Sequence, residues 1–185
     1  MVKLVVSLPK HELKRRYNLT APIYDKRYAQ IQRLKHEVAL SNLPRELGRV
    51  LDLGCGTGEM LALLKRRSKF VVGVDLSEGM LKEARRKNPE VALIQADADR
   101  LPFADQTFDA VVSITLLQNV PSPSKTLGEI ARVLKLGGFA VVTSLKRKHP
   151  PELLRSLVTK ANLKPIKVEE IKGSEDVMCI AVKEA

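Results

Sequence analysis

The sequence predicts an α/β fold in which a doubly wound, mostly parallel sheet of seven strands is covered by helices on both faces. Two observations carry this prediction. From residue 49 onward, short apolar runs of strand length alternate with amphipathic segments of helix length. A glycine-rich run, residues 54–58, joins the first of these strands to the first helix. The 185 residues suffice for one such domain and are too few for two comfortable ones.

Seven segments have the length and apolar content of strands. In chain order they are RVLDLG (49–54), FVVGVDL (70–76), VALIQAD (91–97), FDAVVSI (108–114), FAVVTSL (139–145), PIKVEEIK (165–172) and VMCIAVK (177–183). Only residues 173–176 separate the last two. Because so short a connection cannot make a parallel crossover, we expect these two strands to form an antiparallel hairpin. One strand near the C-terminus should therefore run against the others.

Helices are predicted between the strands at 59–67, 77–87, 124–135 and 151–163. Ser77 is expected to cap the second of these helices, and Asn88-Pro89 to stop it. Gly137-Gly138 should close the third. Residues 1–48 are helical in tendency and, apart from KLVVSL (3–8), contain no obvious strand. We therefore expect a helical segment, 1–48, followed by one globular unit, 49–185.

Composition excludes several classes of protein. No apolar run approaches the ~20 residues that a membrane-spanning helix needs, and the first residues lack the pattern of a signal peptide. Two cysteines fit a reducing compartment, so a cytoplasmic location is expected. The three histidines are scattered, and no Cys/His pair has the spacing of metal ligands. We expect no bound metal and no membrane association.

The net charge of +11 is concentrated toward the ends of the chain. Residues 1–48 hold 10 Lys and Arg against 4 Asp and Glu, and residues 145–172 hold 8 against 3. Basic surfaces of this kind can attract phosphate backbones. They are equally consistent with a solvated surface that keeps the protein soluble.

The run VLDLGCGTGEM (50–60) is where we expect a ligand. A turn from strand to helix offers free backbone N–H groups and the positive end of a helix at the carboxyl edge of the sheet. The glycine pattern is G-x-G-x-G rather than the dinucleotide pattern G-x-G-x-x-G, because Glu59 stands at the third glycine position. An acidic side chain beside a pyrophosphate would be repelled, which disfavours NAD.

Three carboxylates end, or nearly end, three strands that we expect to be neighbours: Asp52, Asp75 and Asp97. Asp75 is placed to accept hydrogen bonds from both hydroxyls of a ribose. Asp97 could accept one from an exocyclic amine, although nearby Asp99 competes for this role. An acidic edge of this kind suits an adenosine ligand that carries a positive charge.

With these residues the chain resembles a class I S-adenosylmethionine-dependent methyltransferase of the small, widespread type 11-like kind. VLDLGCGTGEM resembles the first motif of the family, VVGVDLSEGML the second and ADADRLPF the third. FDAVVSITLLQNV, followed by EIARVLKLGGFAVVTS, resembles the fourth motif and the next helix–strand unit. The similarity covers about residues 24–182 and implies the Rossmann-like methyltransferase fold with S-adenosyl-L-methionine as cofactor.

The resemblance also implies roles for individual residues. Asp52 and the glycine loop would line the methionine part of the cofactor, Asp75 would bind the ribose, and the segment after the fourth strand would lie beside the sulfonium. Residues 1–48 would form a lid, with Tyr24 and Tyr28 over the cofactor, although these two could simply pack as one helix face. The implied cofactor-binding residues are Asp52, Gly54, Gly56, Asp75, Leu76, Met80, Asp97, Ala98, Ser113, Leu117, Tyr24 and Tyr28.

The sequence says less about the methyl acceptor. The Asn/Asp-Pro-Pro-aromatic run of amino-methylating relatives is replaced by residues 113–116, SITL, and a common histidine pair is replaced by Gln118-Asn119. No catalytic residue is therefore assigned. We expect the acceptor to be tRNA or another macromolecule bound by the basic flanks, with a small zinc-binding activator protein as a candidate partner. The alternatives are a small-molecule methyltransferase with residues 1–48 as its lid, and a non-catalytic module that only binds the cofactor.

Overall fold

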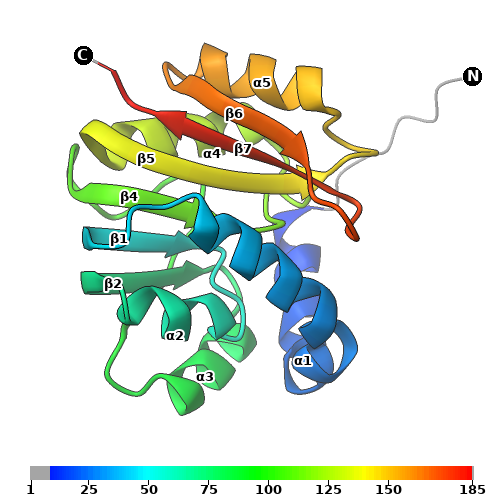
Figure 1. Ribbon diagram of the computed structural model, residues 1–185. Coiled ribbons are helices and arrows are strands. Elements are labelled where there is room, and N and C mark those ends of the chain that lie inside the picture. The colour runs from blue at the N-terminus through cyan, green and yellow to red at the C-terminus, as the bar shows by residue number, and fades with distance from the viewer. Residues whose placement is uncertain (1–8, 185) are drawn as a thin grey trace, which may run out of the picture.

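The computed structural model describes residues 9–184, and these contain the seven expected strands (Figure 1). The strands are β1 (Leu47–Leu53), β2 (Ser68–Asp75), β3 (Ala92–Gln95), β4 (Phe108–Ser113), β5 (Leu134–Leu145), β6 (Lys164–Glu170) and β7 (Asp176–Val182). They form one sheet in the order β3-β2-β1-β4-β5-β7-β6. The order reverses between β1 and β4, which is where doubly wound sheets bind ligands. The candidate strand KLVVSL lies outside the described residues.

The direction of the strands agrees with the prediction. The pairs from β3 through β2, β1 and β4 to β5 are all parallel. Strand β7 pairs antiparallel with both β5 and β6, so β7 is the one reversed strand. The α/β, mostly parallel, seven-stranded fold is therefore confirmed, including the antiparallel hairpin at the C-terminal end.

Five helices connect or precede these strands: α1 (Lys10–Ser41), α2 (Glu59–Lys65), α3 (Glu78–Lys87), α4 (Pro123–Val133) and α5 (Pro151–Lys160). The predicted cap of α3 is present, because Ser77 Oγ accepts a hydrogen bond from the backbone N–H of Met80 at 3.1 Å. The predicted close of α4 at Gly137-Gly138 is wrong. Helix α4 ends at Val133, and β5 begins at the next residue.

The two glycines serve β5 instead. The register of β5 on β4 jumps from Leu134 opposite Phe108 to Phe139 opposite Ala110. Gly137 has φ of 74°, and a side chain on Gly138 would begin 3.0 Å from the backbone oxygen of Asp109. The glycines therefore allow the strand to bulge here while staying close to its neighbour.

Helices cover both faces of the sheet and divide the core in two. Because side chains alternate along each strand, Leu51 and Leu53 of β1 face the side covered by α4 and α5, whereas Val50 faces the side covered by α2, α3 and the end of α1. All three are fully or almost fully buried. This burial on both faces explains why the central strands read as continuous apolar runs in the sequence.

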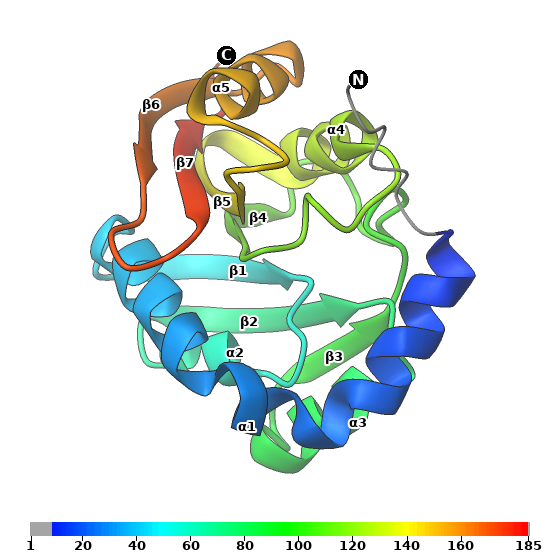
Figure 2. The same cartoon turned by 90° about the vertical axis from the view of Figure 1, so that its right-hand side faces the viewer.

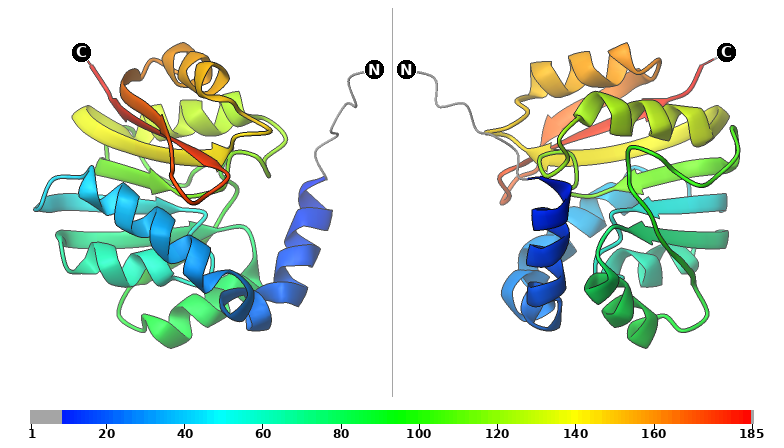
Figure 3. Two further views of the ribbon diagram at one scale, coloured as in Figure 1. Left: turned by 45° about the vertical axis from the view of Figure 1, so that its right-hand side comes forward. Right: turned by 180° about the vertical axis from the view of Figure 1, so that it is seen from behind.

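Helix α1 is one bent element of 32 residues that contains Pro22. A proline inside a helix removes one backbone hydrogen bond and bends the helix. Figure 2 shows that the first part of α1 passes in front of the ends of β1, β2 and β3, and Figure 3 shows the angle between its two parts. Asn18 Oδ1 accepts from the backbone N–H of Gly79 at 3.0 Å and from Ser77 Oγ at 2.7 Å. These bonds hold α1 against the start of α3.

Replacing Gly79 should test this contact. A β-carbon at Gly79 would lie 2.9 Å from the Cα of Asn18, whereas one at Gly128, in α4, would meet no atom within 4 Å. We expect Gly79→Ala to cost about 1–3 kcal/mol of unfolding free energy. We expect Gly128→Ala to stabilise by about 0.5–1 kcal/mol. Urea denaturation measures both, and hydrogen exchange should show loss of protection in the first half of α1 for Gly79→Ala alone. Equal effects of the two substitutions would contradict the contact.

Candidate functional site

Two cavities meet at the carboxyl ends of the parallel strands, beneath α1. The first is lined by the glycine loop, by the ends of β2 and β3, and by the segment that follows β4. The second lies between α1, the same segment after β4, the end of β5 and the turn between β6 and β7. Six residues line both cavities: Tyr17, Tyr24, Tyr28, Gln32, Thr115 and Asn119. We call these six residues the junction.

The glycine loop forms one wall of the first cavity. Gly56 has φ of 52°, and a β-carbon there would meet nothing within 4 Å, so the backbone faces open space. The Gly56 N–H donates to Asp75 Oδ2 at 2.9 Å, and the N–H groups of Gly54 and Cys55 donate to the Val74 carbonyl. These bonds tie the loop to the end of β2. Burial raises the pKa of the Cys55 thiol well above its usual value, so this residue fills the loop as a thiol.

Two carboxyls stand in this wall, the fully buried Asp52 and the half-buried Asp75. Asp75 also accepts from the Ser77 N–H at 2.8 Å, yet burial raises its pKa despite these backbone donors. Burial, and secondarily the charge of Asp75, raises the pKa of Asp52 to about 8. Within residues 9–184, Asp52 Oδ2 is buried and has no hydrogen-bond partner. A buried acceptor of this kind at a cavity wall indicates a ligand with N–H donors or positive charge.

The third carboxylate, Asp97, is bridged to the first turn of α1. Lys10 Nζ lies 2.6 Å from Asp97 Oδ2 and 2.7 Å from Asp99 Oδ2. Burial acts to raise the pKa of Asp97, but the hydrogen bonds from Lys10 and from the Asp99 backbone N–H, together with the charge of Lys10, outweigh it and the pKa is lowered. Asp97 lines the first cavity, whereas Asp99 accepts from Thr126 Oγ1 at 2.6 Å and does not line it. The structure thus favours Asp97 over Asp99 as the ligand-facing acid.

Ten of the twelve residues that the sequence singled out line the first cavity: Asp52, Gly54, Gly56, Asp75, Leu76, Met80, Asp97, Ala98, Tyr24 and Tyr28. The structure does not bring Ser113 and Leu117 to it. Both are fully buried, and Leu117 belongs to the core under α4. The chain turns sharply after β4, since Thr115 has φ of 58°. This turn places Ile114, Thr115 and Leu116 in the wall instead.

Helix α1 supplies residues that sequence reasoning missed. Asp25 accepts from Thr57 Oγ1 at 2.5 Å and pairs with Lys87, which fastens α1 to the glycine loop. Gln32 Nε2 donates to the Tyr24 hydroxyl at 3.1 Å, and within the described chain Gln32 Oε1 is buried without a partner. The spacing 24, 28, 32 places these side chains on one helix face, a signal that could have identified Gln32.

His36 also lines the first cavity, and burial lowers its pKa to about 4. Its imidazole is therefore neutral near pH 7 and accepts a proton poorly. The His36 side chain therefore adds an uncharged polar group to the wall of the first cavity.

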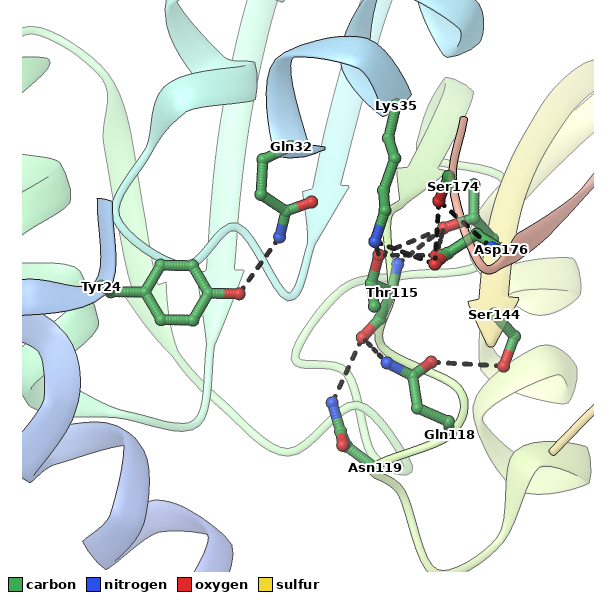
Figure 4. Close-up of polar contacts among 10 residues, drawn as sticks. Tyr24, Gln32, Lys35, Thr115, Gln118, Asn119, Ser144, Ser174 and Asp176 are labelled. Atoms are coloured by element: carbon green, nitrogen blue, oxygen red, sulfur yellow. Dashed lines mark hydrogen bonds and ion pairs between the residues drawn. The ribbon is translucent and has the colours of Figure 1, made fainter. Parts of the chain in front are cut away.

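A buried ion pair lies in the wall of the second cavity, and Figure 4 shows its polar contacts. Lys35 Nζ lies 2.9 Å from Asp176 Oδ1 and donates to Thr115 Oγ1 at 3.0 Å. Thr115 Oγ1 in turn donates to Asp176 Oδ2 at 2.9 Å. Lys35 and Asp176 are only 5% and 1% exposed. The pair holds a β-branched residue in a left-handed conformation that such residues rarely adopt, which is typical of functional sites.

Hydroxyl and amide groups without charge occupy the junction. Asn119 Nδ2 donates to the Tyr17 hydroxyl at 2.9 Å and to the Thr115 carbonyl at 3.2 Å. Burial raises the pKa of Tyr17 to about 12, and it also raises the pKa of Tyr24. Both phenols therefore keep their protons at neutral pH. They can donate hydrogen bonds to a ligand at this place, but they do not serve as bases.

Comparison with known proteins supplies the context for this site. A family model described as a methyltransferase domain matches residues 51–142. The demethylmenaquinone methyltransferase of Beutenbergia cavernae is 40% identical over 131 residues, which are 71% of this chain and 54% of that protein. The malonyl-[acyl-carrier protein] O-methyltransferase of a Marinomonas species is 35% identical over 153 residues, covering 80% and 56%. The chain spans about half the length of the curated relatives it matches.

A solved structure with the same fold is a Haloferax volcanii methyltransferase in complex with the Trm112 methyltransferase activator. Its TM-score is 0.83 at 21% identity, over 91% of this chain and 98% of that one. Within residues 9–184, no helix is long and apolar enough to cross a membrane. The same residues contain no group of three or more His, Cys, Asp and Glu side chains that could hold a metal ion.

The buried ion pair should be visible in stability measurements. Asp176→Leu leaves the Lys35 ammonium buried without its partner, which typically costs about 3–5 kcal/mol. Lys35→Met/Asp176→Leu removes both charges and should recover most of this loss. Urea denaturation of the wild type, both single variants and the double variant gives the coupling free energy. A double variant that loses the sum of the two single losses would contradict a directly coupled pair.

Proposed function

Because the chain belongs to the class I S-adenosylmethionine-dependent methyltransferases, we propose that it transfers a methyl group from S-adenosylmethionine to a small-molecule acceptor. The observation that carries the cofactor assignment is the pair of carboxyls at the glycine loop, of which Asp52 is buried and Asp75 half-buried. Asp75 is held in place by the backbone of Gly56 and Ser77, and Asp52 beside it keeps an oxygen without a partner in the described chain.

The residues of the first cavity fit this cofactor. Asp75 would bind the ribose hydroxyls, and Asp97 with Ala98 would meet the adenine edge, with Leu76 and Met80 against its ring. Asp52 Oδ2 and Gln32 Oε1, the two buried acceptors without partners in residues 9–184, would receive the ammonium of the methionine part. When bound, the cofactor supplies an electrophilic methyl group on a sulfonium.

The protein's own residues would exclude water and position the acceptor. Helix α1 would act as the lid, closing over the first cavity and excluding water. The junction would hold the reacting atom of the acceptor, because both cavities open there and its hydroxyl and amide groups can orient a nucleophile. Ser113 and Leu117, which line neither cavity, would act only by supporting the turn that places Thr115.

The second cavity supports a small-molecule acceptor. Its volume is about 790 Å³, within the range of roughly 300–1,000 Å³ that is usual for small-ligand sites. Two of the relatives are named for a demethylmenaquinone and for a malonyl group on a carrier protein. None of the comparisons supports the expected tRNA acceptor, so we favour the small-molecule alternative. The activator bound to the Haloferax methyltransferase belongs to that protein, and an activator remains a hypothesis here.

Methyl transfer from radiolabelled cofactor into separate small-molecule, protein and RNA fractions of a cell extract tests the proposal. We expect label in the small-molecule fraction. Label in RNA alone would contradict a small-molecule acceptor. Absence of label in every fraction, with and without added extract protein, would favour a non-catalytic cofactor-binding module.

Asp75 should dominate cofactor binding. Asp75→Ala removes a charged acceptor of two ribose hydrogen bonds and should weaken binding of S-adenosylhomocysteine by about 1.5–3 kcal/mol. Isothermal calorimetry measures this loss, and thermal unfolding without ligand shows whether the variant is folded. Asp105→Ala is the matched control, since this exposed aspartate lines neither cavity. Tight binding of NADH, with no response to S-adenosylhomocysteine, would overturn the assignment.

Binding should also depend on pH through Asp52. The pKa of its carboxyl, about 8, means that it is protonated near neutral pH in the free protein. A bound ammonium favours the ionised form, so binding at neutral pH should release a proton, and affinity should rise between about pH 6 and pH 8. Asp52→Asn should remove the rise and this proton release. Calorimetry in buffers of different ionisation enthalpy counts the protons, and equal counts for wild type and variant would refute the role of Asp52.

A further inference from the structure

We propose that the second cavity binds an acceptor with a carboxylate or phosphate group, and that the arginines that line only this cavity hold the anion as an anchor. The inference rests on the proposed function, because it concerns the molecule that receives the methyl group. It deepens that function by assigning the chemical class of the acceptor and the residues that select it.

The charges that line the second cavity are mainly positive. Arg16, Arg27 and Arg147 line it, are exposed, and form no ion pair with any residue in 9–184. Lys35 is neutralised by Asp176. The acid that remains against three guanidinium groups is Glu175. Guanidinium groups without a partner around a cavity of small-molecule size favour a ligand that carries negative charge.

The charged and the uncharged residues of the second cavity form two distinct sets. The three arginines line only the second cavity, whereas the residues of the junction line both cavities and carry no formal charge. A ligand that contacts both sets would thus place its anion at the arginines and an uncharged part at the junction, beside the methyl group. The anion would then fix the orientation of the acceptor, and a different atom of the same molecule would be methylated.

The bend in α1 brings the arginines together. Arg16 precedes Pro22 and Arg27 follows it, so the two parts of the helix each contribute one guanidinium to the same cavity. Arg147 comes from the loop after β5. Their sequence neighbours Arg15 and Lys26 are equally exposed but do not line the cavity. Lys146, next to Arg147, instead pairs with Glu170 at 2.5 Å. The arginines that line the cavity therefore differ in position from their basic neighbours in the sequence, which argues against a uniformly basic surface.

The rest of the wall indicates the body of the acceptor. Ile23, Ile31 and Leu145 line the second cavity together with the three tyrosines of the junction. Apolar and aromatic side chains favour a ring or an alkyl chain. The acceptor class is therefore a small molecule with an apolar or aromatic body and one anionic end.

Matched probes separate the contribution of an anionic group to binding from that of an aromatic ring. Binding of 4-hydroxybenzoate, of its neutral analogue 4-hydroxybenzamide and of phenyl phosphate to the whole protein saturated with S-adenosylhomocysteine can be measured by calorimetry or ligand-observed NMR. We expect one or both anions to bind at least about tenfold more tightly than the amide, the usual effect of a charge-assisted hydrogen bond. The carboxylate and phosphate arms show which anion the arginines prefer.

Variants identify the residues responsible. Arg27→Ala/Arg147→Ala should abolish the preference for the anion, whereas Arg15→Ala/Lys26→Ala removes the same charge from positions outside the cavity and should preserve it. Equal binding of the amide and the anions, no binding of any anionic probe, or equal effects of the two double variants would overturn the proposal. A different result would instead favour a surface that binds nucleic acid: tRNA displaces the probes, and both double variants bind tRNA equally weakly.

Affinity for S-adenosylhomocysteine alone is measured first, because its absence would contradict the proposed function and not the anion site. A wild type that binds S-adenosylhomocysteine but does not discriminate between the probes contradicts the anion site alone. Thermal unfolding of each variant, compared with the wild type, shows that a lost preference does not arise from a lost fold.

Discussion

The site depends on two hydrogen bonds that the carboxylate of Asp75 accepts, from the backbone N–H groups of Gly56 and Ser77. The first fixes the glycine loop to the end of β2, and the second fixes the start of α3 to the same point. Ser77 and Gly79 then donate to Asn18, which holds α1. One half-buried carboxylate thus positions the glycine loop, the start of α3 and helix α1, and this explains why this edge of the sheet has a defined shape.

Two of the ion pairs that hold α1 differ in strength. Lys10 reaches Asp97 and Asp99 near the surface, where its side chain is 33% exposed and water screens the attraction. Lys35 and Asp176 are buried, and separating them would leave an unpaired charge in the core. The pair in the second part of α1 therefore holds the helix more strongly than the pair in its first turn.

Most of the fold and much of the site could be predicted from the sequence. Apolar runs on a two-faced sheet and acids at or near the ends of three strands are local patterns, and Asp52, Asp75 and Asp97 do meet at one edge. The sequence could not predict that Thr115 takes a left-handed conformation, because a tertiary network with Lys35 and Asp176 stabilises that conformation. For this reason Ser113 and Leu117 were expected at the cavity, where Ile114 and Leu116 lie instead. The bulge at Gly137 could not be predicted either, because a Gly-Gly pair after a helical segment is also the usual pattern of a helix end.

The two cavities have opposite electrostatic character, and this bears on how a methyl group would pass between them. The first is lined by Asp52, Asp75 and Asp97, which suit a cofactor that carries positive charge. The second is lined by three arginines, which suit an acceptor that carries negative charge. Neither ligand would be attracted to the other's cavity, so the charges alone sort the two molecules. The residues of the junction between them carry no formal charge, and the one ammonium that bonds to the junction, that of Lys35, is paired with Asp176. In the proposed reaction the cofactor would lose its positive sulfonium charge, so the acidic wall of the first cavity would hold the product less strongly than the cofactor.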